Sequence, residues 1–208
     1  YGFEIFGIKI FGKDEPDPAE DVIGEPQHYS VTFNVSGEDS GLKKRLEAAS
    51  TLVKDEEKPA SGAAGLLAKA RGDYRRLLST LYGEGRYGTT ISITVDGREA
   101  ADLAPDTEFP DPAAVVVAID PGPLFHFGEA NVVNPAPPAQ HRRDEVPAPA
   151  EEGYAPGEVA RSGTILKAEA LTVEAWRQQG HAKAKAIDRR VVAAHDRDLV
   201  DATVGADP

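Results

Sequence analysis

Cysteine and methionine are both absent from the 208-residue sequence, and no apolar run reaches the roughly 18 residues that a membrane-spanning helix needs. Without cysteine, thiol catalysis, disulfides and cysteine zinc sites are excluded, and the absence suits an oxidising compartment. A gene product begins with methionine, whereas this chain begins at Tyr1. We therefore expect a processed or trimmed chain from which any signal peptide has been removed.

Positive charge is also scarce, because 35 acidic side chains face 23 basic ones and the net charge is -12. Nucleic acids and anionic membranes recruit clusters of Lys and Arg, so neither is an expected partner. Aromatic residues make up 7% of the chain and fall mostly on faces expected to be buried. An adhesin or glycan-binding module, which usually presents exposed aromatic rings, is therefore disfavoured.

Motifs for catalysis are missing as well. The sequence has no G-x-S-x-G elbow, Walker loop or G-x-G-x-x-G motif. The acidic pairs Glu56–Glu57 and Glu151–Glu152 lie in polar segments, whereas general acid–base work needs a carboxyl group in an apolar pocket. No histidine has a ligand spacing with a carboxylate; the five are His28, His126, His141, His181 and His195. We expect no enzyme, no metal and no cofactor.

The first 27 residues form an N-terminal extension. Residues 1–12, YGFEIFGIKIFG, are apolar on both faces and must pack on something or form a short anchoring strand. Residues 13–27 are acidic and contain proline, which indicates a linker.

A first module is expected over residues 28–123. YSVTFNV from Tyr29 alternates like a half-buried strand, and two helical stripes follow, the second ending at Gly83 and Gly85. ISITV from Ile91 is a second strand. AAVVVAID up to Asp120 is apolar on both faces, which predicts the central strand of the sheet. The order strand, helix, helix, strand, strand predicts a two-layer α+β module.

The same order begins again over residues 124–208. FHFGEANVV is a strand, a helical stripe surrounds Trp176, and two strands close the sequence. The region 135–157 is rich in proline, so the first helix of this module is expected to be short or missing. Gly85 corresponds to Gly180, and Asp120-Pro121 to Asp207-Pro208, which makes a weak internal repeat.

These motifs resemble the polypeptide-transport-associated (POTRA) domain family. The resemblance rests on RYGTTISITVDG, on VVVAIDPGPLFHFGEANVV, and on the helices ARGDYRRLLSTLYGEGRYG and LKAEALTVEAWRQQGH. It implies tandem modules of order β-α-α-β-β, each a three-stranded mixed sheet with two helices on one face. Among POTRA proteins the sequence resembles the TamA family, the outer-membrane subunits of the translocation and assembly module.

Membership of that family would imply a periplasmic arm on a C-terminal membrane β-barrel, with a role in outer-membrane protein assembly. It would also imply a TamB-like inner-membrane-anchored partner and unfolded outer-membrane or autotransporter clients. A different assembly subunit, a two-partner secretion transporter and a passive spacer are the alternatives.

Two places are candidate functional sites. The edge strand 89–95 carries Thr90, Ser92 and Thr94 outward, and it or its counterpart near 186–194 could add an extended client segment as another strand. The seam Pro121–Gly122–Pro123 leaves almost no loop between the modules, and its prolines are expected to stiffen the joint.

Overall fold

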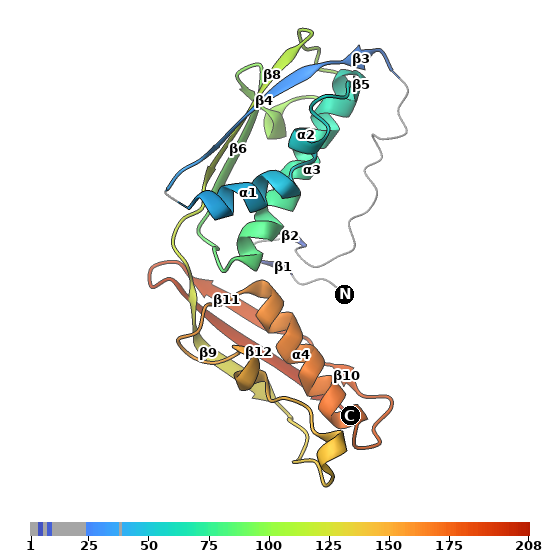
Figure 1. Ribbon diagram of the computed structural model, residues 1–208, viewed down its shortest axis with the longest axis vertical. Helices are drawn as coiled ribbons and strands as arrows, with labels where there is room; N and C mark the ends of the chain where they lie inside the picture. The colour runs from blue at the N-terminus through green and yellow to red at the C-terminus, as the bar shows by residue number, and fades with distance from the viewer. Residues whose placement is uncertain (1–3, 6–7, 10–23, 38) are drawn as a thin grey trace. The chain divides into compact units, whose positions relative to one another are not determined.

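The computed structural model describes residues 4–5, 8–9, 24–37 and 39–208, and the chain separates into two compact units (Figure 1). Unit 1 contains Tyr1–Leu81 and Thr89–Gly122, and unit 2 contains Tyr82–Gly88 and Pro123–Pro208. Strands β1 (Glu4–Ile5) and β2 (Ile8–Lys9) pair with each other. The expected roles of the rest of residues 1–23 lie outside the described residues.

The sheet of unit 1 has the order β4-β8-β6-β7. Strand β4 (Tyr29–Val35) runs parallel to the central β8 (Ala113–Asp120), and β6 (Thr90–Val95) runs antiparallel to it. The central place of β8 confirms what its two apolar faces predicted. Two features differ from expectation. Pro26–Gln27, assigned to the linker, form strand β3 with β5 (Ala60–Ser61), and the loop after β6 begins with strand β7 (Arg98–Glu99).

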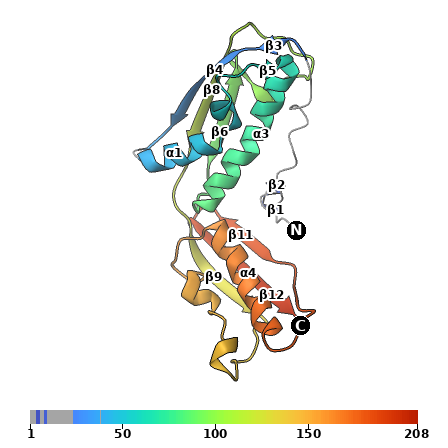
Figure 2. The same ribbon diagram turned by 45° about the vertical axis from the view of Figure 1, so that its right-hand side comes forward.

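The helices of unit 1 cover one face of this sheet (Figure 2). The first predicted stripe is two helices, α1 (Ser40–Ala49) and α2 (Thr51–Lys54), because Ser50 interrupts it. Asp73 of helix α3 (Gly62–Gly83) accepts hydrogen bonds from Ser50 Oγ, Thr51 N and Leu52 N at 2.6, 2.9 and 3.1 Å. A carboxylate at the start of α2 satisfies N–H groups that the helix cannot pair itself. Gly85, with φ of +82°, follows the end of α3 as its glycine pattern predicted.

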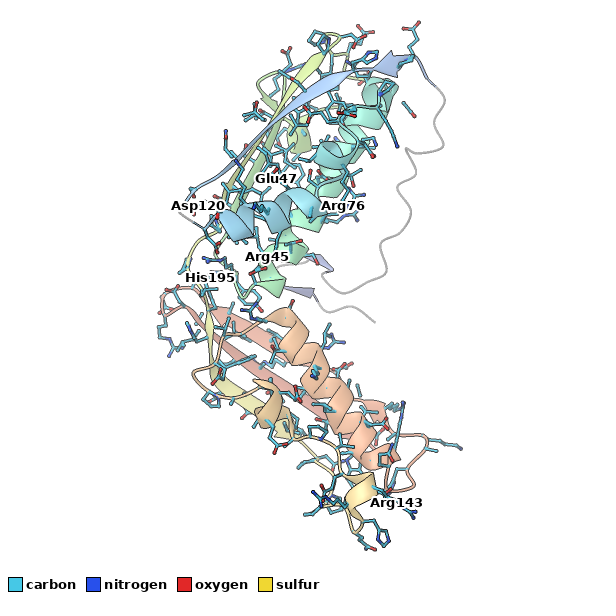
Figure 3. The ribbon with its side chains drawn as sticks, viewed as in Figure 1. Arg45, Glu47, Arg76, Asp120, Arg143 and His195 are labelled. Atoms are coloured by element: carbon cyan, nitrogen blue, oxygen red, sulfur yellow. The ribbon has the colours of Figure 1, made fainter. Side chains whose placement is uncertain are left out.

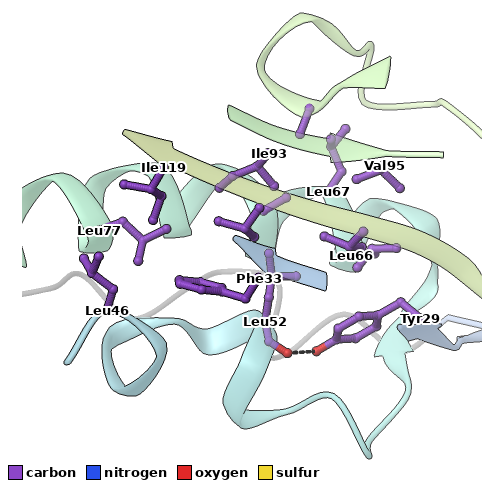
Figure 4. Close-up of a cluster of buried hydrophobic side chains, with 14 of the residues drawn as sticks. Tyr29, Phe33, Leu46, Leu52, Leu66, Leu67, Leu77, Ile93, Val95 and Ile119 are labelled. Atoms are coloured by element: carbon purple, nitrogen blue, oxygen red, sulfur yellow. Dashed lines mark hydrogen bonds between the residues drawn. The ribbon is translucent and has the colours of Figure 1, made fainter. Parts of the chain in front are cut away.

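The core of unit 1 lies between the helices and the inward side chains of the sheet (Figure 4). Tyr29 and Phe33 of β4 pack with leucines of all three helices, and the Tyr29 hydroxyl donates to Leu52 O at 2.8 Å. The opposite face of the sheet carries the small residues of each strand, such as Ser30 and Thr32, which are exposed. The alternation read from the sequence therefore sorts the two faces correctly.

Unit 2 repeats this strand order. Strand β9 (His126–Val133) is parallel to the central β12 (Leu199–Asp207), and β11 (Arg190–Ala194) is antiparallel to it. Strand β10 (Lys185–Ala186) pairs with the end of β12, and Ile187 N donates to Gly205 O, so β10 and β11 form one antiparallel partner interrupted near Arg189.

Helix α4 (Ser162–Arg177) covers one face of this sheet, with Ile165, Ala168 and Val173 buried. The first helix of a module is reduced here to the 3-10 helices η3 (Arg142–Asp144) and η4 (Pro149–Glu152), as the proline density led us to expect. Unit 1 has a further 3-10 helix, η2 (Ala100–Asp102). The predicted fold class, a tandem α+β arrangement with mixed sheets, is confirmed.

Candidate functional site

The backbone of β6 alternates between its neighbour β8 and the outer edge of the sheet. Asp96 N donates to Ala114 O of the β8 side, whereas Ile93 N donates outward to the Glu99 carboxylate. Since hydrogen-bonding directions alternate along an antiparallel strand, Ile91, Ile93 and Val95 are the outward residues. The edge available to a partner is therefore set by these three positions.

Most of that edge is already occupied. The Asp96–Gly97 turn, with φ of +51° and +78°, folds β7 back so that Val95 pairs with Arg98. Glu99 then lies over Ile93, and its Oε1 accepts from Ile93 N at 3.2 Å. Ile91 is the outward residue of β6 that neither β7 nor Glu99 covers.

Glu99 is held in place by two further donors. The Tyr74 hydroxyl of α3 lies 2.6 Å from Oε1, and Ser92 Oγ lies 2.7 Å from Oε2. Burial raises the pKa of the Glu99 carboxyl, but the hydrogen bonds from Tyr74, Ser92 and Ile93 N outweigh it, so the pKa lies below its ordinary value. The carboxylate is therefore charged at neutral pH. We call Glu99, bound in this way to the outer side of β6, the edge plug.

The opposite edge of unit 1 has a similar feature. Glu56, in the turn after α2, accepts from Val31 N of β4 at 3.0 Å. A carboxylate thus takes an edge N–H on each side of this sheet. Native sheets commonly protect their edges with inward-turned charges, which prevents unwanted strand pairing.

In unit 2 the edge formed by β9 is covered by the chain itself. Phe127 N donates to Glu158 O, Gly157 N donates to Phe127 O, and Ala160 N donates to Phe125 O. Farther along β9, the buried Tyr154 hydroxyl donates to Asn131 O or Ala202 O, at 2.9 and 3.0 Å. The segment before α4 therefore occupies this edge.

The edge formed by β11 is different. Within the described residues β11 pairs with β12 alone, and no other strand adjoins its outer side. Val192, at its centre, is 48% exposed, and Arg190 at its start is exposed too. Arg189, at the interruption before β11, forms an ion pair with Glu169 of α4, with 3.0 Å between Nε and Oε2. This ion pair joins the start of β11 to the helix. The outer side of β11 is therefore a candidate edge for strand addition in the part of the chain that the structure describes.

The structure places the predicted site residues as follows. Thr90, Ser92 and Thr94 have their backbone groups directed at β8 and their side chains on the open face of the sheet, and Ser92 binds Glu99. Pro121 is buried and Pro123 exposed. Gly122 N donates to the Asp120 carboxylate at 3.1 Å, which makes a local turn at the end of β8 (Figure 3 labels Asp120).

Sequence reasoning missed Glu99, Tyr74 and the segment over β9. The dipeptide Asp96-Gly97, flanked by alternating residues, is a recognised hairpin signal and could have revealed β7. The segment over β9 has no such signal, because its contacts join residues about thirty positions apart. In the described part of the chain no group of three His, Asp or Glu residues could hold a metal ion, and no helix is long and apolar enough to cross a membrane.

The chain was compared with known proteins. No protein-family model matches it, and no curated protein sequence matches it. It is similar in structure to POTRA domains 1–2 of the periplasmic domain of Omp85 from Anabaena, with 13% identity over 86% of this chain and 94% of that one and a TM-score of 0.46. It is also similar to POTRA domains 3–5 of Haemophilus influenzae BamA, with 14% identity over 88% of this chain and 65% of that one and a TM-score of 0.47. Both of these solved structures are of POTRA domains.

Proposed function

We propose that the chain is a periplasmic POTRA arm of an outer-membrane protein assembly or translocation factor of the TamA type. Its modules are residues 28–123 and 124–208. The observation that carries the proposal is the repeated topology, in which the first strand is parallel to the last and the second is antiparallel to it in both units. The repeated order and the motifs around the seam support one module following another.

The arm acts by binding extended segments, and β11 is the binding edge. Strand addition uses main-chain hydrogen bonds and reads little sequence, which suits a protein that handles many unfolded barrel precursors or a TamB-like partner. Of the two predicted edges, β6 and the strand near 186–194, the second is proposed because β7 and Glu99 cover most of β6. The Pro121–Gly122–Pro123 joint is part of the proposal as a stiff connection that sets the reach of the arm.

A cross-linking experiment tests strand addition. Because the chain has no cysteine, Val192→Cys creates a unique thiol on the β11 edge. The Val192→Cys variant is mixed with peptides from the C-terminal periplasmic segment of the TamB-like partner and oxidised. Each peptide carries one cysteine, and its position moves along the segment from one peptide to the next. Directly opposed residues in adjacent strands are close enough for a disulfide. We expect cross-links at every second peptide position, since side chains alternate between the faces of a strand.

Two matched variants serve as controls. Ala118→Cys places an exposed thiol on the central strand β8, which has no edge, and should give no periodic pattern. Ser92→Cys tests β6. Equal, non-periodic cross-linking at all three positions would refute strand addition. Periodic cross-linking at Ser92→Cys alone would move the site to β6. A folded chain that cross-links nowhere would favour the passive-spacer alternative.

The stiff joint needs its own measurement. Spin labels on Thr32→Cys and Glu158→Cys, one in each unit, report the distribution of distances between the modules. A narrow distribution is expected, and a broad one that is unchanged by Pro121→Gly with Pro123→Gly would refute the stiffening role of the prolines.

A further inference from the structure

The proline-rich segment of unit 2 and helix α4 enclose a pocket of about 410 Å³. Val132 of β9 and Leu171 and Ala175 of α4 contribute its apolar lining. Two stretches, 135–139 and 144–149, line it as well. A volume of this size lies in the range of ligand pockets, about 300–1,000 Å³.

Hydrogen bonds from helix α4, from the turn that follows it and from within the segment hold these stretches in place. Trp176 Nε1 donates to Asn134 O at 2.8 Å, and Gln179 Nε2 donates to Pro137 O. At the other stretch, Ala148 N donates to the Glu151 carboxylate at 2.8 Å. The stretch that leaves β9 is thus tied directly to the helix and the other is fixed at η4, so the pocket is a formed feature of the unit.

The lining is rich in acceptors and negative charge. It contains five prolines, each with a carbonyl acceptor and no N–H donor, namely Pro135, Pro137, Pro138, Pro147 and Pro149. It also contains the carboxylates of Asp144, Glu145 and Glu151 and no Lys, Arg or His. Arg143 on η3, labelled in Figure 3, approaches Asp144 at 3.8 Å, but its side chain is 83% exposed.

We propose that this pocket binds an extended peptide segment that carries a Lys or Arg next to an apolar side chain. The cation meets the three carboxylates, and its methylene stem and the apolar neighbour cover Leu171 and Ala175. A peptide fits better than a single amine because the five prolines leave these stretches with few N–H donors, and a peptide supplies N–H donors along its length. The site is separate from the β11 edge and does not depend on strand addition.

The test is a titration of the whole chain with the capped peptide GSLKLRVSG, followed by amide NMR. We expect shifts at Val132, Leu171 and Ala175 and binding that weakens with added salt. The matched peptide GSLELEVSG, which replaces both cations with glutamate, should cause no shifts there. Hexylamine, a cation without a peptide backbone, should bind at least tenfold more weakly than the basic peptide.

Charge reversal provides the variant and its control. Glu145→Lys, at an exposed position of the lining, should weaken the basic peptide about five- to tenfold, since a short-range attraction becomes a repulsion. Glu158→Lys makes the same change at an exposed position outside the lining and should leave the affinity unchanged. Equal effects of the two variants, equal binding by both peptides, comparable affinity for hexylamine, or shifts confined to β11 would each overturn the proposal.

Discussion

Replacing the edge plug, Glu99→Ala, should loosen the outer side of β6. The carboxylate accepts from Ile93 N, Tyr74 and Ser92 at 3.2, 2.6 and 2.7 Å. A hydrogen bond to a charged group contributes about 1.5–3 kcal/mol when buried. Glu99 is only partly buried, and water can replace it at each donor, which lowers the figure. We expect a total loss of about 1–2 kcal/mol in the local opening free energy.

The measurement is the hydrogen exchange of the Ile93 amide, which donates to the plug. A loss of about 1.4 kcal/mol corresponds to roughly tenfold faster exchange. Glu57→Ala, which removes an exposed glutamate from the turn after α2, is the control and should change the rate little. If both variants exchange at the wild-type rate, the carboxylate does not protect this edge.

The pH dependence of Ile93 protection is a second, independent test of the Glu99 contact. The folded pKa of Glu99 lies below its ordinary value of 4.5, so its contribution to stability is present above that value. The contribution is lost as the pH falls through the lower, folded pKa. Protection of Ile93, corrected for the intrinsic exchange rate, should therefore fall in acid in the wild type and stay flat in Glu99→Ala. An identical acid profile in both proteins would contradict this assignment.

Three further substitutions test contacts within each unit, one in unit 1 and two in unit 2. Asp73→Asn removes the charge of a fully buried carboxylate that three donors and Arg76 surround, and should cost about 3 kcal/mol in guanidinium unfolding followed by circular dichroism. Gly205→Ala would place a Cβ 2.6 Å from the backbone oxygen of Val133, and should cost about 2–3 kcal/mol by the fluorescence of the single tryptophan. Tyr87→Phe removes the buried donor to Ala160 O and should cost about 1–1.5 kcal/mol by the same signal. In each case an unfolding midpoint within error of wild type would show that the contact does not contribute.

The regular elements could be predicted from the sequence because each carries its own periodicity. The alternation of β4 and the apolar run of β8 are local patterns, and the structure confirms the two faces of β4 and the central position of β8. The helix-ending glycines were also predictable, since Gly85 and Gly180 both have a positive φ that other residues adopt rarely. The division at Ser50 was not, because it depends on Asp73, which lies twenty-three residues away in the chain.

The state of the sheet edges could be predicted from these patterns only in part. An alternating strand looks the same whether its outer side is open or covered. The cover on β9 comes from residues 157–160, and the cover on β6 comes from β7 of the same hairpin and its Glu99 side chain. The contact between Glu99 and Ile93 spans only six residues, and the Asp96-Gly97 hairpin signal could have indicated it. The cover on β9 is non-local, because it joins residues about thirty positions apart.

The two modules therefore differ in the feature that matters most for the proposed function. Their strand order is shared, so the sheet itself does not decide which module binds an extended segment. The decision lies in the connections. In unit 1 the hairpin after β6 returns Glu99 to the edge, whereas in unit 2 the corresponding strand β11 continues through a turn directly into β12. Transferring the edge plug from unit 1 to the outer side of β11 tests whether edge cover decides which module binds. A chain in which β11 is covered should lose partner cross-linking at Val192→Cys, and removal of Glu99 should create cross-linking at Ser92→Cys.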